Sequence, residues 1–164
     1  MKSPDLGMTE QFLFPSTIFV EPMPHHVLTI LGSCIAVCLY DERLKYGGIN
    51  HYMLPWWNGN VMPTPKYGDV AIERLIEKMV SLGSYQEDLV AKIFGGAHQH
   101  TAVESGLGVG DRNIVTAEKI LNMEGIPIIS RNTGGDRGRR IVFHTHTNQV
   151  FMKFLSAVEL KQAV

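Results

Sequence analysis

Short apolar runs separated by turn-forming residues dominate the first third of the chain. Residues 17–20 and 26–31 form two such runs, and residues 34–40 and 48–54 form two more around the polar, glycine-ended segment 41–47. Apolar, β-rich runs on both sides of a polar turn are typical of a β-hairpin. We therefore expect strands over all four runs, with the last two paired as a hairpin.

Two later segments have the three-to-four-residue apolar spacing of an amphipathic helix. In residues 69–83 the apolar face consists of Ile72, Leu75, Ile76 and Met79. In residues 110–125 it consists of Ile114, Ala117 and Leu121. We expect a helix over each range. Residues 55–68, between the hairpin and the first helix, contain three prolines and two glycines, which predicts a loop.

Four more runs typical of strands follow, and after them a short polar tail. The runs cover residues 88–96, 126–130, 139–145 and 150–155. Hairpins therefore mix with strand-to-helix crossovers, which favours a layered α+β domain over a doubly wound parallel fold. A chain of 164 residues suits one domain, so we expect residues 1–164 to form a single unit.

The overall composition argues against several classes of protein. Fifteen basic and sixteen acidic residues give a formal net charge of −1, so no global charge favours nucleic acid or a membrane surface. No apolar run approaches the length needed to cross a bilayer, and the first residues lack the pattern of a secretion signal. We expect a cytoplasmic protein, whose two cysteines stay reduced.

Both cysteines, Cys34 and Cys38, lie in the first arm of the predicted hairpin. Free cysteine is usually small apolar packing, and Cys38, within an apolar run, fits that interpretation. Cys34 differs because it follows Gly32 and Ser33, where the chain can turn and the thiol can face a cleft. A cysteine nucleophile needs a base, and His51 on the second arm can come within reach of Cys34 and form a thiolate–imidazolium pair. A strand histidine without a catalytic role is the plain alternative.

Two histidine pairs carry a weaker chemical signal. His98 with His100, and His144 with His146, could each supply half of a metal site. No acidic or thiolate partner lies at a recognised spacing, so solvated histidines are the better interpretation. We expect neither a metal nor a cofactor.

Other motifs are equally weak. Residues 105–111 contain three glycines at two-residue spacing, but not in the order of a dinucleotide-binding loop. Residues 134–140 could bind a phosphate or a carboxylate, but a hairpin loop with exposed arginines is the better interpretation. Trp56 and Trp57 either contact a partner or fold back onto the core.

Seven sequence blocks together resemble one protein family. They are LGSCIAVCLYD (31–41), GGINHYMLP (47–55), KYGDVAIERLIEKM (66–79), AKIFGGA (91–97), GDRN (110–113), GIPI (125–128) and TGGDRGRRIVFHT (133–145). In this order they are similar to the CheD family, the chemoreceptor glutamine deamidases of bacterial and archaeal chemotaxis. The likeness runs from about residue 29 to residue 151.

The resemblance implies that Cys34 is a catalytic nucleophile and His51 its catalytic histidine. It implies a fold like the catalytic domain of the cytotoxic necrotizing factor toxins, a central β-sandwich with helices outside. The implied reaction is hydrolysis of glutamine side chains on cytoplasmic receptor helices, through a thioester, to glutamate. The implied protein partner is the CheC phosphatase.

The third catalytic residue of the family is a threonine, six positions before the cysteine. Leu28 occupies that position here, and Thr29 is one residue closer to Cys34. One step along a strand reverses the face on which a side chain lies. Either a β-bulge near Gly32 restores the face, so that Thr29 orients His51, or a backbone carbonyl orients His51 instead. We expect the bulge.

Other functions remain open on the sequence. A lysine amine could attack the same thioester, which would make the protein a transglutaminase, or the site could cut peptide bonds. The chain could act mainly as a regulatory binding partner of CheC, with weak catalysis. It could also be a soluble α+β domain without enzymatic activity, although the combination of Cys34 and His51 argues against that.

Overall fold

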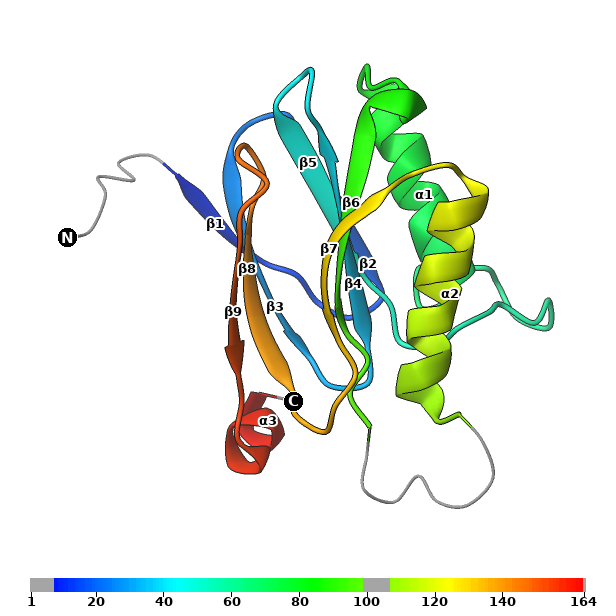
Figure 1. Cartoon of the computed structure of the whole chain (residues 1–164), viewed down its shortest axis with the longest axis vertical. Helices are drawn as coiled ribbons and strands as arrows, with labels where there is room; N and C mark the ends of the chain where they lie inside the picture. The colour runs from blue at the N-terminus through cyan, green and yellow to red at the C-terminus, as the bar shows by residue number, and fades with distance from the viewer. Residues whose placement is uncertain (1–7, 99–106, 164) are drawn as a thin grey trace.

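The structure, a computed structural model, describes residues 8–98 and 107–163, which form two β-sheets, with two long helices against one sheet and a short helix at the end of the other (Figure 1). Sheet A has the strand order β1-β3-β8-β9, and sheet B has the order β2-β5-β4-β6-β7. The strands are β1 Thr9–Phe12, β2 Thr17–Val20, β3 His25–Leu31, β4 Ile35–Asp41, β5 Tyr46–His51, β6 Leu89–Gly95, β7 Ile128–Thr133, β8 Arg139–His144 and β9 Val150–Phe154. The helices are α1 Gly68–Ser81, the 3₁₀ turn η1 Gln86–Asp88, α2 Val109–Met123 and α3 Ala157–Ala163.

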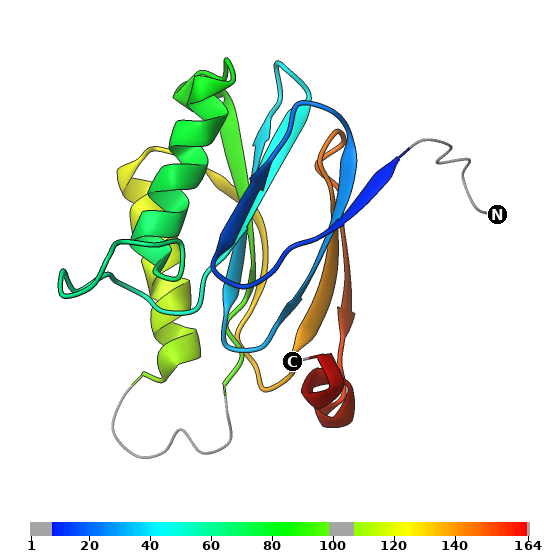
Figure 2. The same cartoon turned by 180° about the vertical axis from the view of Figure 1, so that it is seen from behind.

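The predicted hairpin is confirmed as the antiparallel pair β4 and β5, with Cys38 opposite Ile49 and Asp41 opposite Tyr46. Both sheets are mixed, because β1 runs parallel to β3 and β6 runs parallel to β7. The chain between β6 and β7 contains α2, so this parallel pair is a β-to-helix crossover. Figure 2 shows the layers from behind, with α1 and α2 on the left and sheet A on the right, above α3. The α+β sandwich with helices outside is therefore confirmed, while the likeness to the toxin domain stays a prediction.

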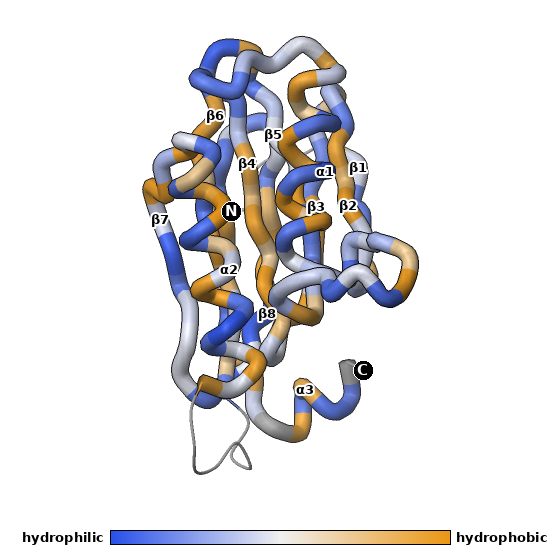
Figure 3. The backbone as a smooth tube through the Cα atoms, turned by 90° about the vertical axis from the view of Figure 1, so that its right-hand side faces the viewer, coloured by the Kyte–Doolittle hydropathy of each residue, from blue (hydrophilic) through white to orange (hydrophobic). Residues whose placement is uncertain are grey.

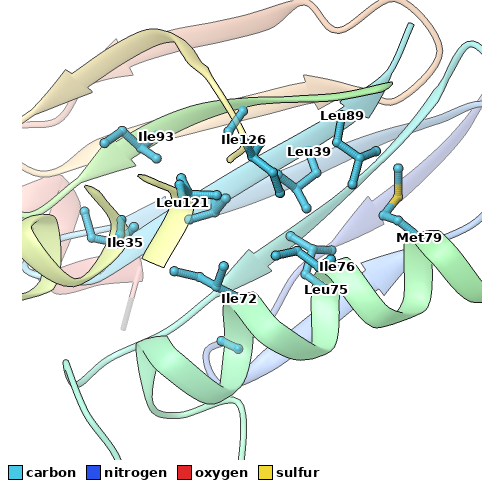
Figure 4. Close-up of a cluster of buried hydrophobic side chains, with 14 of the residues drawn as sticks. Ile35, Leu39, Ile72, Leu75, Ile76, Met79, Leu89, Ile93, Leu121 and Ile126 are labelled. Carbon is cyan, nitrogen blue, oxygen red and sulfur yellow. The ribbon is translucent and has the colours of Figure 1, made fainter. Parts of the chain in front are cut away.

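Every residue of β4 is buried, because the strand lies between two hydrophobic cores. Ile35, Val37 and Leu39 face the helices and belong to the larger core, part of which is shown in Figure 4. Ala36 and Cys38 point the other way, into the core between the two sheets. This alternation is the two-residue period of a strand with both faces covered. Cys38 is fully buried, as its apolar neighbours predict.

Both predicted helices are present and cover the outer face of sheet B. Figure 3, viewed onto the helical layer, shows apolar residues recurring along α1 and α2. The buried face of α1 includes all four residues that the spacing predicts, and Met79 and Leu75 have no exposed surface. In α2, Ala117 and Leu121 are fully buried, and Ile114 packs against the same core.

Besides the short turn η1, two elements were not expected from the sequence. All four residues of β1 are exposed, so the strand has no apolar alternation to reveal it. α3 forms where a polar tail was predicted. Its start is a capping box, in which Ser156 Oγ accepts from the Glu159 N–H at 3.1 Å and Glu159 Oε1 accepts from the Ser156 N–H at 3.2 Å. Across residues 8–98 and 107–163, no helix is long and apolar enough to cross a membrane.

Candidate active site

Cys34 lies in the turn by which the chain crosses from one sheet to the other. β3 ends at Leu31 in sheet A, and β4 begins at Ile35 in sheet B. Gly32 and Ser33 make the crossing between them. Strand periodicity therefore does not continue through this turn, and residues before and after it cannot be assigned to faces by counting alone.

Backbone hydrogen bonds hold the turn against the end of β6. The Ala97 N–H donates to the Gly32 carbonyl at 3.0 Å, and the Gly96 N–H donates to the Cys34 carbonyl at 2.9 Å. Gly95 has a φ of 110°, and a Cβ on it would collide with the Cys34 carbonyl oxygen. Glycine at position 95 thus allows the close approach that fixes the backbone of Cys34.

The partly buried thiol of Cys34 lines a cavity of about 420 Å³. Met53, Leu54 and Lys66 line it on one side, and the first turn of α2, residues 108–110, lines it on another. Burial raises the pKa of Cys34 to about 11, although its own backbone N–H acts in the opposite direction. Cys38 does not line this cavity, and burial raises the pKa of its thiol further.

The register of the hairpin places His51 next to Cys34. Ile35 pairs with Tyr52 in continuation of the β4–β5 pairing, so Cys34 and His51 are diagonal neighbours on one face. Such neighbours in an antiparallel pair have Cα atoms about 7 Å apart, with their Cβ atoms closer. Within the described residues, Nε2 of His51 is buried and has no hydrogen-bond partner. The two groups are therefore neighbours without a hydrogen bond between them.

Thr29 contacts His51 from the opposite sheet. Its Oγ1 lies 2.7 Å from His51 Nδ1 and donates its own proton to the Leu13 carbonyl at 2.8 Å. Because the hydroxyl proton is used by Leu13, the oxygen must accept from Nδ1–H. That arrangement selects the tautomer in which Nε2 carries a lone pair.

The expected bulge is not the reason for this contact. The described pairings of β3 with β1 and β8 have no register shift, and Gly32 lies outside every strand. Thr29 faces inward because it shares one face of β3 with the buried Val27 and Leu31, at two-residue spacing. The prediction of a bulge was wrong because it placed Thr29 and Cys34 in one continuous strand, whereas they belong to different sheets.

Burial determines the charge state of the unliganded site. His51 is only 2% exposed, and burial lowers its pKa to about 4. With the thiol pKa at about 11, the site at neutral pH contains a thiol and a neutral imidazole. This differs from the thiolate–imidazolium pair expected from the sequence. The base can still act, because an unprotonated Nε2 is the form that takes up a proton.

Asn113, near the start of α2, joins the two sides of the site. Its side-chain amide donates to the Ser33 carbonyl at 2.9 Å and to the Met53 carbonyl at 3.0 Å. The Tyr52 hydroxyl in turn donates to the Asn113 carbonyl at 2.5 Å. Asn113, which is fully buried, thus connects the residue before Cys34 with the two residues after His51, through its side-chain amide to Ser33 and Met53 and through its backbone carbonyl to Tyr52. Its one signal in the sequence is the GDRN block (110–113), which does not by itself indicate a role at the site.

The other histidines lie away from Cys34 or serve different contacts. His98 Nδ1 lies 3.2 Å from Asp111 Oδ2 at the rim of the cavity, while His100 lies outside the described residues. His144 stacks on His26 with ring centres 3.6 Å apart, and the ring of His146 is 6.3 Å from that of His144. Among residues 8–98 and 107–163, no group of three or more His, Cys, Asp or Glu side chains is arranged to hold a metal ion.

One expectation for the arginine-rich loop was wrong. Arg137 and Arg140 are exposed, but Arg139 is only 2% exposed. Its guanidinium donates to Asn132 Oδ1 at 2.8 Å and to the Gly134 carbonyl at 2.7 Å. Arg139 thus closes the loop between β7 and β8 rather than facing solvent. Residues 105 and 106 of the glycine-spaced segment lie outside the described residues.

The two tryptophans of the loop after β5 have different surroundings. Trp57 is partly buried, and its Nε1–H donates to the Val61 carbonyl at 2.7 Å within the loop. Trp56 remains 44% exposed beside α2, so it does not fold back onto the core.

One edge of this two-sheet sandwich thus brings together a thiol that lines a cavity, a buried imidazole and a threonine hydroxyl that orients the imidazole. A family model described as "CheD chemotactic sensory transduction" matches residues 53–154. Relatives named "Probable chemoreceptor glutamine deamidase CheD" include that of Sulfurimonas denitrificans, 40% identical over 92% of this chain and 97% of its own. The one from Trichlorobacter lovleyi is 43% identical over 86% of this chain and 88% of its own.

The likeness extends to archaea. The relative with the same name from Archaeoglobus fulgidus is 39% identical over 79% of this chain and 83% of its own. The chain belongs to the CheD family.

Proposed function

We propose that this protein hydrolyses glutamine side chains on the cytoplasmic helices of chemoreceptors to glutamate, with Cys34, His51 and Thr29 as its catalytic residues. The observation that carries the proposal is the oriented His51, whose Nε2 lone pair has no partner within the described residues. By the register of the hairpin, His51 is the diagonal neighbour of Cys34, whose side chain lines the cavity. The names of its relatives supply the substrate class.

The first half of the reaction forms a thioester. When a glutamine amide occupies the cavity, Cys34 Sγ attacks the amide carbon as its proton passes to His51 Nε2. The carbonyl oxygen becomes an oxyanion, and the imidazolium is stabilised by its hydrogen bond to Thr29. The proton on Nε2 then moves to the amide nitrogen, the C–N bond breaks, and ammonia leaves.

The second half releases glutamate. A water molecule attacks the thioester carbon while Nε2 of His51 takes a proton from it. The C–S bond breaks, Nε2 gives this proton to the departing sulfur so that the thiol of Cys34 is restored, and the carboxylic acid formed ionises to a carboxylate. Because both groups start neutral, His51 acts as a general base during attack rather than by holding a preformed thiolate.

The oxyanion requires donors near Cys34. The N–H groups of Ser33 and Cys34 lie in the turn itself, and the N-terminal end of α2 faces the same cavity. The positive end of a helix dipole favours a negative charge that develops close to it. These groups therefore support the attack step without any further side chain.

Incubation with a cytoplasmic receptor fragment tests this function. Mass spectrometry should find glutamine converted to glutamate, with release of ammonia, by the wild-type protein and not by Cys34→Ser. Crosslinked fragments would indicate a transglutaminase instead, and shortened fragments would indicate a protease. A fragment that remains unchanged would refute the proposal.

The cellular setting follows from the same family. Because the receptor segments concerned are cytoplasmic, the protein is proposed to act in the cytoplasm. Binding to the CheC phosphatase remains a prediction, and so does a mainly regulatory role. If a Cys34→Ala protein still restores chemotaxis in a strain that lacks the gene, the regulatory role is the main one.

A further inference from the structure

A second hollow adjoins the cavity at Cys34. Its volume is about 230 Å³, and its lining consists of Pro55, Trp56, Leu107, Arg112 and Val115. Pro55 directly follows Leu54 of the first cavity, and Leu107 directly precedes Gly108 of the same cavity. Consecutive residues are 3.8 Å apart at Cα, so the two hollows are neighbours on one surface.

The lining of this hollow exposes large apolar side chains. Trp56 is 44% exposed, Leu107 is 62% exposed and Val115 is 48% exposed. Three such residues gathered around one depression are typical of an interaction site, and tryptophan is a frequent anchor in such sites. Trp56 belongs to the loop after β5, Val115 belongs to α2, and Leu107 directly precedes Gly108, the N-cap residue of α2.

The charged residues beside the hollow are mostly basic. Arg112, Val115 and Lys119 recur at helical spacing on the exposed face of α2, and Lys119 Nζ lies 5.6 Å from the centre of the Trp56 ring. The acidic neighbours on the helix are already paired, Asp111 with His98 and Glu118 with Arg131. A partner that fits here carries an apolar side chain flanked by carboxylates.

We propose that this hollow is a substrate subsite, which binds an apolar side chain of the receptor helix while Arg112 and Lys119 contact acidic residues beside it. The proposal rests on the proposed function and adds a criterion for which receptor glutamines are substrates. A helix rises 1.5 Å per residue, so a neighbouring hollow is reached by a residue four or seven positions from the glutamine, about 6 to 10 Å away. Glutamines without such a neighbour are poor substrates.

Two substitutions test the subsite, and a third serves as a matched control. Trp56→Ala removes the anchor, and Val115→Glu places a carboxylate in the hollow at an exposed helix position. Val80→Glu makes the same change at a 44% exposed valine on α1, outside both hollows. Conversion of a receptor fragment is followed at varied concentration, and iodoacetamide labelling of Cys34 reports whether the reactive site is intact.

The expected result is a KM raised tenfold or more in Trp56→Ala and Val115→Glu, with kcat, labelling of Cys34 and the Val80→Glu protein unchanged. A substitution that weakens binding of the substrate and of the transition state equally raises KM and leaves kcat unchanged. Unchanged KM values in both variants would overturn the subsite.

A binding measurement separates this proposal from the proposed function. The fragment is titrated into Cys34→Ser protein, with and without Val115→Glu, by calorimetry at two salt concentrations. Tenfold weaker binding with Val115→Glu supports the subsite even if the wild-type protein converts no glutamine. Equal binding to the two proteins, or no binding to either, overturns the subsite. Sedimentation gives an independent check: a dimer that Val115→Glu dissociates would mean that self-association covers the hollow, and this also overturns the subsite.

Discussion

Replacing Thr29 with valine removes one hydroxyl from the centre of the site and little else. Thr29 has no exposed surface, and valine has nearly the same shape. The change leaves the Leu13 carbonyl and the His51 Nδ1–H without their partner, at distances of 2.8 and 2.7 Å in the native protein. A buried polar group left without a partner costs about 1–3 kcal/mol. Because two such groups are left, we expect the free energy of unfolding to fall by about 2–6 kcal/mol.

The effect on catalysis is larger than that of a neutral hydrogen bond, because His51 becomes charged when it accepts the thiol proton. A hydrogen bond to a charged group contributes about 1.5–3 kcal/mol, which corresponds to a fall in kcat of about 10- to 150-fold. Thr29→Ser keeps both bonds and should retain most activity. Initial rates of glutamine conversion measure this, and nitrogen NMR of labelled His51 should show a mixture of tautomers only in Thr29→Val.

A fully active Thr29→Val protein would refute the reasoning and leave Cys34 and His51 as a pair. So would a Thr29→Ser protein as slow as Thr29→Val, because the hydroxyl would then not be the active part.

Three further predictions follow from the same geometry. Cys34→Ser should abolish deamidation with little loss of stability, whereas Cys38→Ser should stay active but unfold more easily, since it places a hydroxyl in an apolar core; a dead Cys38→Ser enzyme contradicts this. Because the pKa of buried His51 is lowered to about 4, its contribution to stability is complete above about pH 6.5 and declines by about 3 kcal/mol as pH falls towards 4. Denaturant titrations from pH 7 to pH 4 should show a smaller decline in His51→Gln, and equal declines would mean that His51 is not buried in its neutral form. Asn113→Asp sets a carboxylate against the Ser33 and Met53 carbonyls, so kcat should fall at least tenfold with KM unchanged, whereas Thr116→Val in the same helix should keep wild-type kinetics; equal kinetics in both variants contradicts a positioning role.

The hairpin and both amphipathic helices could be read from the sequence because each has a strong local period. The neighbourhood of Cys34 and His51 follows from the same local pattern, since the polar segment 41–47 sets the register between β4 and β5. Thr29 is different. Its contact with His51 is made across the sandwich, so it depends on how the two sheets pack, and counting residues along the chain led to a wrong geometric reason.

Other features depend on contacts that no local pattern encodes. Asn113 acts on carbonyl groups 80 and 60 residues away in sequence, and a lone asparagine near a helix start has many possible functions. β1 has no buried face and is specified only by its partner strand. α3 had a readable signal, because Ser156 and Glu159 have the spacing of a capping box, but the polar composition of the tail concealed it.

The burial of β4 between two cores has a consequence for motion. A strand whose two faces belong to different cores cannot open without disrupting both, so its amide hydrogens should exchange only when the whole protein unfolds. Cys34 is joined directly to this strand, whereas none of the residues 55–67 is buried. Hydrogen exchange should therefore be slow beside Cys34, the proposed nucleophile, and fast in the nearby loop. The proposed reacting atom is attached to a strand covered by two cores, and the exposed loop beside the cavity is the part that can adjust to different substrates.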